Sequence, residues 1–287
     1  MRKEQDIKAE LSDLLKDEKP NYSAILALSN ELAQLDSEHV RFSVDAGLIN
    51  RLGIELVSRQ ETAVSELVKN AFDADATEVS LKFINTSSLG GSLVISDNGI
   101  GMTREQLVDG FMRISSSDKI DNPLSPFYHR KRAGKKGIGR FAVQRLGTKL
   151  IILTKSINSN YAYKVTINWD EYENNDNLIE ISHTIQEELV DFEHGTTLSI
   201  LDLRDKWSEA AIRRIYRYVI DIMQPISLST EVIDKSEDPG FKSIFTIVEN
   251  GLKKEIIDTS KDISNYAIGE FNGEIDSSHI GFYHVKS

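Results

Sequence analysis

The spacing of apolar residues divides the chain into a helical amino-terminal part and a longer part in which helices and strands alternate. Over residues 4–36, Leu and Ile recur at helical spacings on both sides of Pro20, which predicts one or two amphipathic helices. Further along, the helical period predicts helices near 58–75, from 103, near 139–146 and near 208–223. Two-residue alternation predicts strands near 78–84, 92–97, 149–155, 161–168, 178–184 and 196–203.

The order of these elements favours one fold class. The predicted strands cluster after the helices, and the last four follow one another directly, as in an antiparallel meander. We therefore expect an α/β fold, a two-layer sandwich in which a mixed, largely antiparallel sheet carries helices on one face. Three regions are expected: a helical arm over 1–37, a main domain over 38–228, and a segment over 229–287 in which strand-like alternation returns. The last region is expected to begin a second domain.

Composition places the chain among ordinary globular proteins and removes several kinds of site. Of its 287 residues, 40% are hydrophobic and 28% are charged, and a chain of this length buries enough surface to fold without covalent staples. Cys is absent, which excludes disulfides, thiolate metal sites and cysteine nucleophiles. The six His residues lack the spacing of metal ligands, so no histidine-based metal site is expected. Neither a secretory signal nor an apolar run of bilayer length is found, so we expect a cytoplasmic protein without a membrane partner.

Charge is distributed unevenly along the chain. The 34 basic and 45 acidic side chains leave a net charge of -11, which opposes nucleic-acid binding unless positive charge is gathered locally. Such a gathering occurs over residues 119–149, where nine basic side chains face a single acid, Asp121. The nine are Lys119, Arg130, Lys131, Arg132, Lys135, Lys136, Arg140, Arg145 and Lys149.

Three polar residues share one face of the helix predicted near 58–75. Glu66, Asn70 and Asp73 stand at i, i+4 and i+7 beside an apolar stripe, so their side chains project from the same side. A carboxamide oxygen suits the octahedral shell of a hard Mg²⁺ ion, and a carboxylate one turn away can orient and deprotonate a water. The alternative is an ordinary core helix with a solvated polar face.

Two capping boxes mark helix starts. Ser58 is followed three residues later by Glu61, and Thr103 is followed three residues later by Gln106. In such a pair each side chain accepts a hydrogen bond from the other residue's backbone N–H, so the pattern predicts that the two helices begin there.

A buried-looking strand leads into a tight turn at residues 97–101. Gly99 and Gly101 allow positive φ and let the backbone approach a flat ligand without an intervening Cβ. Asp97, at the strand end, can accept a hydrogen bond from an exocyclic amine such as adenine N6. A plain Asn-Gly hairpin turn is the alternative.

A glycine-rich stretch precedes the helix predicted near 139–146. Gly134, Gly137 and Gly139 run into the helical pattern, and open backbone N–H groups at a helix start favour a bound phosphate. The spacing fits neither a P-loop nor a dinucleotide-binding fingerprint. A flexible, solvated loop is the alternative.

In this order the segments resemble the GHKL superfamily of ATPases, whose Bergerat fold is shared by gyrase B subunits, heat-shock chaperone ATPases, MutL and MORC proteins, and histidine kinases. The resemblance covers about residues 45–205. Residues 66–74 are similar to the N box, 97–102 to the adenine-binding G1 box, 134–139 to the G2 box of the ATP lid, and 194–198 to a late Gly-Thr element. The Asp-Ala-Asp-Ala-Thr run that starts at Asp73 resembles the hydrolytic branch of the superfamily more than the histidine kinases.

The resemblance implies a role for each matching residue at the purine end. Asp97 would accept a hydrogen bond from adenine N6, helped through ordered water by Gly101 and Thr196. Gly99 and Met102 would belong to the same nucleotide-binding set.

At the phosphate end, Glu66 would be the general base for the attacking water and Asn70 the Mg²⁺ ligand, with Asp73 supporting the same helix face. Lys119 would lie near the terminal phosphate. The residues expected to surround the phosphates are Gly134, Gly137, Ile138, Gly139, Arg140 and Phe141.

The implied activity is Mg²⁺-dependent binding and hydrolysis of ATP, with ATP and ADP as ligands, lid closure, ATP-gated pairing of two copies, and an unidentified protein client, as in chaperone-like members. One alternative is a non-hydrolysing nucleotide switch that presents a surface to a partner. Another is a histidine-kinase-like catalytic domain, although the helical arm lacks a phosphoacceptor His. A third is nucleic-acid contact through the basic residues of 119–149.

Overall fold

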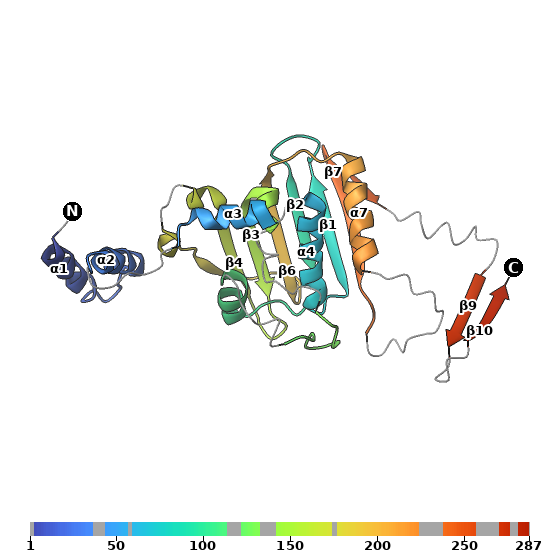
Figure 1. Cartoon of the computed structure of the whole chain (residues 1–287), viewed down its shortest axis with the longest axis horizontal. Helices are drawn as coiled ribbons and strands as arrows, with labels where there is room; N and C mark the ends of the chain where they lie inside the picture. Colours follow the sequence, from blue (N-terminus) through green and yellow to red (C-terminus); the bar gives the residue numbers. More distant parts are fainter. Residues whose placement is uncertain are drawn as a thin grey trace.

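The computed structural model describes residues 3–36, 44–56, 59–113, 122–132, 142–173, 177–223, 238–256, 270–275 and 281–286 (Figure 1). Its centre is an eight-stranded sheet with the strand order β5-β4-β3-β6-β2-β1-β7-β8. Neighbouring strands are antiparallel except β1 and β7, which are parallel. The strands are β1 (Glu78–Ile84), β2 (Ser92–Asp97), β3 (Gly147–Lys155), β4 (Ala162–Asn168), β5 (Ile185–Glu188), β6 (Gly195–Leu203), β7 (Lys242–Glu249) and β8 (Leu252–Ile256).

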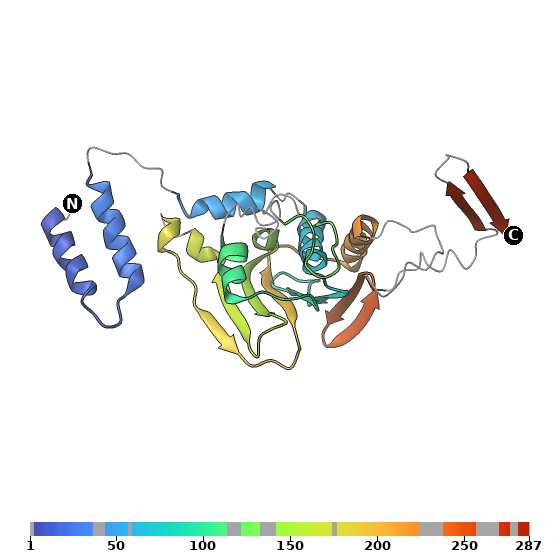
Figure 2. The same ribbon diagram turned by 90° about the horizontal axis from the view of Figure 1, so that it is seen from below.

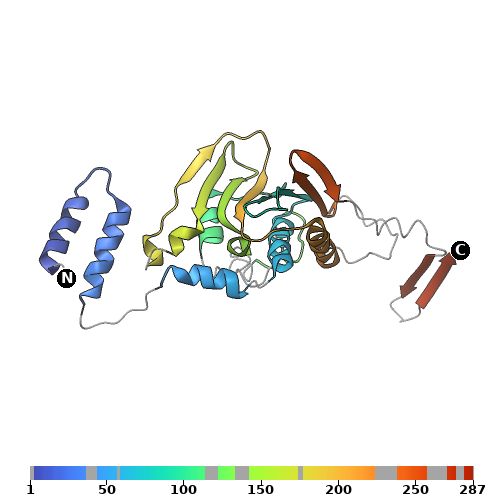
Figure 3. The ribbon, with the colours of Figure 1, turned by 90° about the horizontal axis from the view of Figure 1, so that it is seen from above.

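Helices cover one face of this sheet, which confirms the predicted two-layer α/β sandwich. Figure 2 and Figure 3 show the molecule from below and from above, and in both views α3, α4 and α7 lie on the same side of the sheet. The helices of this layer are α3 (Gly47–Leu56), α4 (Gln60–Asp73), α6 (Ala142–Leu146) and α7 (Glu209–Met223). Three further helical segments connect the elements: the π-helix η1 (Gln106–Met112) and the 3₁₀ helices η3 (Trp169–Tyr172) and η4 (Leu178–Glu180).

The hydrophobic core lies between the sheet and helices α4 and α7. Alternate residues of each strand and every third or fourth residue of each helix face this core, which is the pattern that two-residue and 3.6-residue periods produce. Aromatic rings join β1, β7 and α7 near its edge: Phe83 stacks on Phe245 at 5.7 Å, and Tyr216 meets Phe245 edge-on at 5.1 Å. Buried members include Leu67, Val68, Ala71, Val79, Leu81, Phe83, Leu93, Ile95, Ile212, Ile215, Val219 and Phe245.

Two hairpins stand outside the sheet, one near each end of the chain. The first consists of α1 (Glu4–Leu14) and α2 (Tyr22–Gln34), which confirms the helices predicted for the amino-terminal region. The second consists of β9 (Glu270–Ile275) and β10 (Gly281–Lys286), which form a separate two-stranded sheet. Within the described part of the chain, no helix combines the length and apolar character needed to cross a membrane.

The sheet continues beyond the boundary expected at residue 228. Strand β7 pairs in parallel with β1, from Glu78 opposite Lys242 to Ile84 opposite Val248, and β8 pairs with β7. Residues 242–256 are therefore part of the main sheet and do not start a separate one. The division of the remaining chain into domains stays a prediction.

Several element boundaries differ from the sequence prediction. The expected strand at 178–184 is absent; Asn177 accepts a hydrogen bond from the N–H of Ile179 and starts the turn η4, and pairing begins only at Ile185. Helix α4 begins at Gln60 with Arg59 at its N-cap and no side-chain cap, while Ser58 lies outside the described residues. At 178–184, the local hydrogen bond to the Asn177 side chain thus favours a turn over the strand that the apolar alternation predicts.

The second capping box is confirmed. The N–H of Gln106 donates to the Thr103 hydroxyl at 3.2 Å, and the N–H of Thr103 donates to the Gln106 side-chain oxygen at 2.9 Å. This reciprocal pair ends the turn that follows β2 and begins the next helical segment.

Replacing Phe245 by Ala tests whether β7 is an integral part of the sheet. We expect the free energy of unfolding to fall by about 3–5 kcal/mol, because a fully buried ring that contacts Phe83 and Tyr216 is lost. Urea denaturation followed by circular dichroism measures the change. The control is Leu252→Ala on β8, where the side chain is 79% exposed and a change within about 0.5 kcal/mol is expected. Similar small losses in both variants would contradict the placement of β7.

Candidate functional site

Helix α4 carries the three polar residues that the sequence places on one face. Glu66 and Asn70 are half-buried, and Asp73 is only 4% exposed. The other sides of the helix bury its apolar residues against the sheet. With a rise of about 1.5 Å per residue, Asn70 lies about 6 Å beyond Glu66 along the helix axis. The helix thus presents a carboxylate, a carboxamide and a buried carboxylate in series.

The carboxylate of Glu66 has a cationic partner that the sequence reasoning missed. Nζ of Lys69 lies 2.8 Å from Oε1 of Glu66, with the two side chains 19% and 28% exposed. The i,i+3 spacing brings such pairs together on a helix surface. The ion pair therefore orients the Glu66 carboxylate along the polar face of α4.

Strand β2 ends at Asp97, whose carboxylate turns back into the structure. Its Oδ1 accepts hydrogen bonds from the N–H of Gly99 at 2.9 Å and from the N–H of Thr196 at 3.3 Å. Oδ2 has no hydrogen-bond partner within the described ranges. Burial raises the pKa of Asp97 to about 6, and the two N–H groups and His194 offset part of that rise.

The turn after Asp97 lies directly on the backbone of two other strands. Gly101 has a φ of 64°, and a Cβ there would lie 1.9 Å from the carbonyl oxygen of Lys155 at the end of β3. Gly195 begins β6 with a φ of 128°, and a Cβ there would lie 2.1 Å from the carbonyl oxygen of Asp97. Only glycine fits either position, so these residues set how closely the three elements meet.

Thr154 joins the same turn to β6 through its buried hydroxyl. Its Oγ1 accepts a hydrogen bond from the N–H of Met102 at 2.9 Å and donates to the carbonyl oxygen of Gly195 at 3.3 Å. The Thr196 hydroxyl lies 2.9 Å from Oγ1 of Thr154. Because Thr154 already donates its single hydroxyl hydrogen to Gly195, Thr196 is the donor in this second contact. The sequence signal was a polar residue on the buried face of an otherwise apolar alternating strand, because Leu150 and Ile152 share that face.

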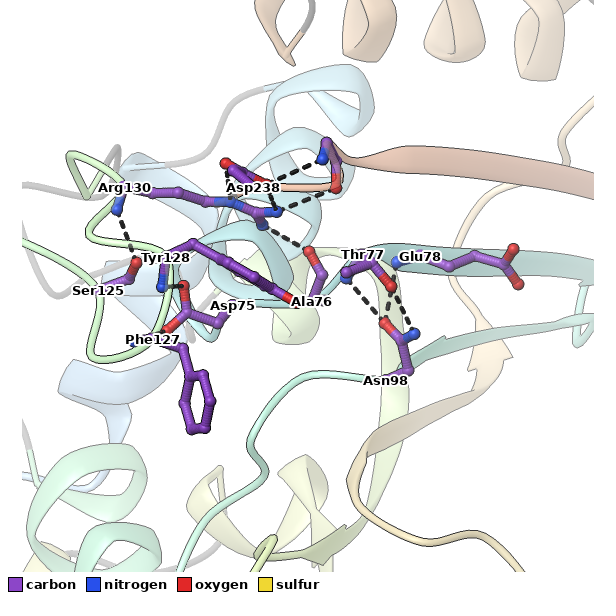
Figure 4. Close-up of polar contacts among 11 residues, drawn as sticks. Asp75, Ala76, Thr77, Glu78, Asn98, Ser125, Phe127, Tyr128, Arg130 and Asp238 are labelled. Atoms are coloured by element: carbon purple, nitrogen blue, oxygen red, sulfur yellow. Dashed lines mark hydrogen bonds and ion pairs between the residues drawn. The ribbon is translucent and has the colours of Figure 1, made fainter. Parts of the chain in front are cut away.

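The end of α4 meets the turn at residue 74. The carbonyl oxygen of Ala74 accepts a hydrogen bond from the N–H of Ile100 at 2.9 Å. Next to it, the side-chain oxygen of Asn98 accepts from the N–H groups of Thr77 and Glu78, both at 2.9 Å (Figure 4). Asn70 lies one helical turn before Ala74, so the structure brings Asp97 and the polar face of α4 to the same end of the sandwich.

The loop before β6 encloses the turn from the other side. Nδ1 of His194 lies 2.7 Å from the carbonyl oxygen of Gly99, so Nδ1 carries the proton and donates it. Nζ of Lys155 donates to the carbonyl oxygen of Phe192 at 3.1 Å. The first contact joins the β5–β6 loop to the glycine turn and the second joins it to the end of β3, and neither is visible as a local sequence pattern.

Several predicted phosphate-end residues lie outside the described residues, so their positions stay predictions. They are Lys119, Gly134, Gly137, Ile138, Gly139, Arg140 and Phe141.

Two members of the basic group over 119–149 have carboxylate partners in the fold. Arg130 lies 2.6 Å from Asp238, and Arg145 lies 2.6 Å from Asp205. Their charge is balanced within the protein, so the local excess of positive charge over 119–149 is smaller than the sequence suggests. The partners stand far away in sequence, so local composition alone does not reveal the pairing.

Comparison with known proteins agrees with the family resemblance seen in the sequence. Residues 57–196 match the family described as histidine kinase-, DNA gyrase B- and HSP90-like ATPase. This range contains α4, β1 to β5 and the glycine turn, and it ends at Thr196 at the start of β6. Every described residue of the predicted site therefore lies within the matched range.

Curated relatives share only part of their length with this chain. The DNA mismatch repair protein MutL of Rickettsia canadensis is 27% identical over 251 residues, which cover 83% of this chain and 38% of that protein. The chaperone protein HtpG of Helicobacter pylori is 32% identical over 128 residues, 38% of this chain and 20% of HtpG. The MutL of Chlamydia muridarum is 30% identical over 131 residues, 41% of this chain and 22% of that protein. The chain thus spans less than half the length of each relative.

Replacing Gly101 by Ala tests the close contact at the turn. A Cβ would overlap the Lys155 carbonyl at a positive φ, so the free energy of unfolding should fall by about 2–5 kcal/mol. Thermal denaturation checks this. The matched control is Gly110→Ala in η1, where a Cβ meets nothing within 4 Å and a change below about 1 kcal/mol is expected. Equal stability of the two variants would show that the turn does not lie on β3 as described.

Proposed function

Because residues 57–196 belong to the histidine kinase-, DNA gyrase B- and HSP90-like ATPases, we propose that this chain binds ATP together with Mg²⁺ and hydrolyses it. The observation that carries the proposal is the junction at Ala74, where the turn after Asp97 meets the end of α4. Starting from that junction, Asn70 lies about 6 Å and Glu66 about 12 Å along the helix. The turn, Asn70 and Glu66 thus stand in the order of the base, the phosphates and the water that attacks the last phosphate.

The purine end is proposed to lie at the glycine turn. Oδ2 of Asp97 is an acceptor without a partner in the described structure, and adenine N6 carries the N–H donor that such an acceptor would bind. Ionised carboxylates accept stronger hydrogen bonds than neutral oxygens do, so Asp97 gives selectivity for an amino-purine. Thr196 and Gly101 would help Asp97 to bind adenine through ordered water. Gly99 and Met102 would lie beside the flat purine ring.

The phosphate end is proposed to lie along the polar face of α4. Oxygen donors of the Asn70 and Asp73 type suit Mg²⁺, and the half-buried amide of Asn70 is the ligand we propose, with Asp73 fixing the helix face. When bound, Mg²⁺ neutralises charge on the phosphate oxygens. Lys119 and residues 134–141 are proposed from the sequence to surround the same phosphates.

Glu66 is proposed as the general base that takes a proton from the attacking water. Its carboxylate belongs to the same helix face as Asn70, and Lys69 orients it at 2.8 Å. Proton abstraction requires the carboxylate to reach the water, so Lys69 has to share Glu66 with that water during turnover.

The ion pair also supports a second candidate, a nucleotide-binding switch with negligible turnover. If Lys69 keeps Glu66 engaged while ATP is bound, the water lacks a base and the bound nucleotide serves as a signal to a partner. The relatives act in mismatch repair and as chaperones, so the biological process of this chain does not follow from family alone.

Lid closure and pairing of two copies on ATP binding complete the proposal, and light scattering with a non-hydrolysable ATP analogue detects such pairing.

Glu66→Gln tests the hydrolytic function. Removing the base while keeping the side chain's size should lower kcat for ATP about 100-fold or more, whereas the Kd for ATP should change less than about threefold. Steady-state phosphate release and calorimetry measure the two quantities. Glu61→Gln, in the first turn of the same helix, is the control and should retain the wild-type rate.

Each outcome separates the candidates. Absence of ATP binding by the wild type would refute the proposed function. Equal and slow turnover in wild type and Glu66→Gln, with intact binding, would favour the switch.

Asp97→Asn should stabilise the protein and weaken nucleotide binding together. The folded pKa of Asp97, about 6, lies above the ordinary 3.8, so its contribution to stability is largest below pH 4 and is lost as pH rises towards 6. At pH 7 an amide removes the cost of the buried charge, and we expect about 1–3 kcal/mol of added stability. The amide would place a donor where adenine N6 needs an acceptor, so ATP affinity should fall at least about tenfold.

Urea denaturation at pH 7 and pH 4 and calorimetry with ATP check both effects. The gain in stability should shrink at pH 4, where the wild-type carboxyl is largely protonated. An Asp97→Asn protein that binds ATP as tightly as wild type would refute the purine contact.

A further inference from the structure

Residues 122–132 form a small hairpin that contacts the end of α4 (Figure 4). Leu124 and Lys131 form a β-bridge, the N–H of Ser125 donates to the Arg130 carbonyl oxygen at 2.9 Å, and the N–H of Arg130 donates to the Ser125 hydroxyl at 2.8 Å. We call this segment the 122–132 tether. It lies in the chain between two expected phosphate-binding parts, Lys119 and residues 134–141.

Arg130 is the centre of the contact between the tether and the rest of the domain. Nε and Nη2 donate to the two oxygens of Asp238 at 2.9 and 2.6 Å, Nη1 donates to the Ala76 carbonyl at 2.5 Å, and Nη2 also donates to the Gly240 carbonyl at 3.0 Å. Four of its five N–H bonds thus have partners. The residue is 5% exposed, so this charge depends on those partners.

Two aromatic rings enclose the guanidinium. Its carbon lies 4.8 Å from the ring centre of Phe72 in the last turn of α4 and 4.7 Å from that of Tyr128 in the tether. Cation–π contact strengthens when solvent is excluded, as it is here. Arg130 therefore joins the tether, the end of α4 and the segment before β7 in one cluster.

Asp75 joins the tether to the same place from the other direction. Its Oδ2 accepts a hydrogen bond from the N–H of Phe127 at 2.7 Å, and its Oδ1 accepts from the N–H of Tyr128 at 3.2 Å (Figure 4). Asp75 has a φ of 58°, in the left-handed region that residues other than Gly, Asn and Asp rarely adopt. The two tether contacts stabilise this conformation.

Three consecutive residues thus connect the tether with the purine end. Ala74 accepts from Ile100 of the glycine turn, Asp75 accepts from the tether, and Ala76 accepts from Arg130. Residues this close along a chain cannot shift independently, so displacement of the tether changes the position of the Ala74 carbonyl.

We propose that Asp75 and Arg130 are positioning residues for the nucleotide site, through which the 122–132 tether sets the geometry of the 97–101 turn. The inference rests on the proposed function in naming ATP as the ligand. The coupling itself concerns the protein without nucleotide. It also connects the segment before β7, through Asp238, to the purine end.

Asp75→Asn tests the coupling. Asn retains the preference for positive φ but has one acceptor oxygen instead of two, so one tether N–H loses its partner. We expect amide hydrogen exchange in residues 97–101 of the nucleotide-free protein to accelerate about three- to tenfold relative to the β3–β4 amides, and the Kd for ATP to rise by a similar factor. Asp238→Asn, which weakens the partner of Arg130 at a side chain 34% exposed, should change both in the same direction.

The control is Asp205→Asn, which weakens a comparable ion pair with Arg145 away from residues 74–76. A merely structural role predicts uniform acceleration of exchange in all three variants with unchanged ATP affinity of the folded protein, and that result would overturn the proposal. If the wild type binds no ATP, the proposed function fails, while selective acceleration at 97–101 in Asp75→Asn and Asp238→Asn still upholds the coupling. No selective acceleration in either variant overturns the coupling whatever ATP does.

Discussion

Direct contact between backbones at the 97–101 turn is the constraint on which the candidate site depends. Gly101 packs against the Lys155 carbonyl and Gly195 against the Asp97 carbonyl, so the ends of β2 and β3 and the start of β6 lie close together. A side chain at either glycine would separate these strand ends and admit water to the Asp97 carboxylate. The raised pKa of Asp97 follows from that closeness, because the carboxylate has lost solvent and the two backbone N–H groups and His194 offset only part of the cost. The site retains a destabilising charge, which is a common property of ligand-binding groups.

Helix α4 has to satisfy two demands with one periodicity. Its apolar residues fix the helix against the sheet, and its polar face presents Glu66, Asn70 and Asp73 in register with the turn. Because the helix ends at Asp73 and Ala74 already contacts Ile100, a single helical turn separates the 97–101 turn from Asn70, the proposed metal ligand. Helix α4 thus fixes the distances between the residues proposed to contact different parts of the nucleotide.

Much of this arrangement could be predicted from sequence because its signals are local. Strand ends, glycines at 99 and 101, and the i, i+4, i+7 spacing on α4 are readable within a few residues. Thr154 and His194 could not be assigned in this way, since their partners stand 52 and 95 residues away. The pairing of Arg130 with Asp238 spans 108 residues, so the sequence alone does not distinguish this buried structural cation from the other basic residues of 119–149. Register between distant strands depends on tertiary packing, which is why the position of β7 was also missed.

The parallel pairing of β1 and β7 explains how a segment distant in sequence reaches the end of the sandwich where α4 meets the 97–101 turn. Parallel strands begin at the same edge, and Glu78 at the start of β1 stands opposite Lys242 at the start of β7. The N–H of Lys242 donates to the Thr77 carbonyl, so residues just before β7 lie beside those just before β1. Asp238 and Gly240 therefore lie close to residues 75–77, and Arg130 contacts both Asp238 and Gly240 there. Had β7 run antiparallel to β1, this segment would lie at the opposite edge, and the tether would lose Asp238 and Gly240 while keeping its contacts with Phe72, Asp75 and Ala76.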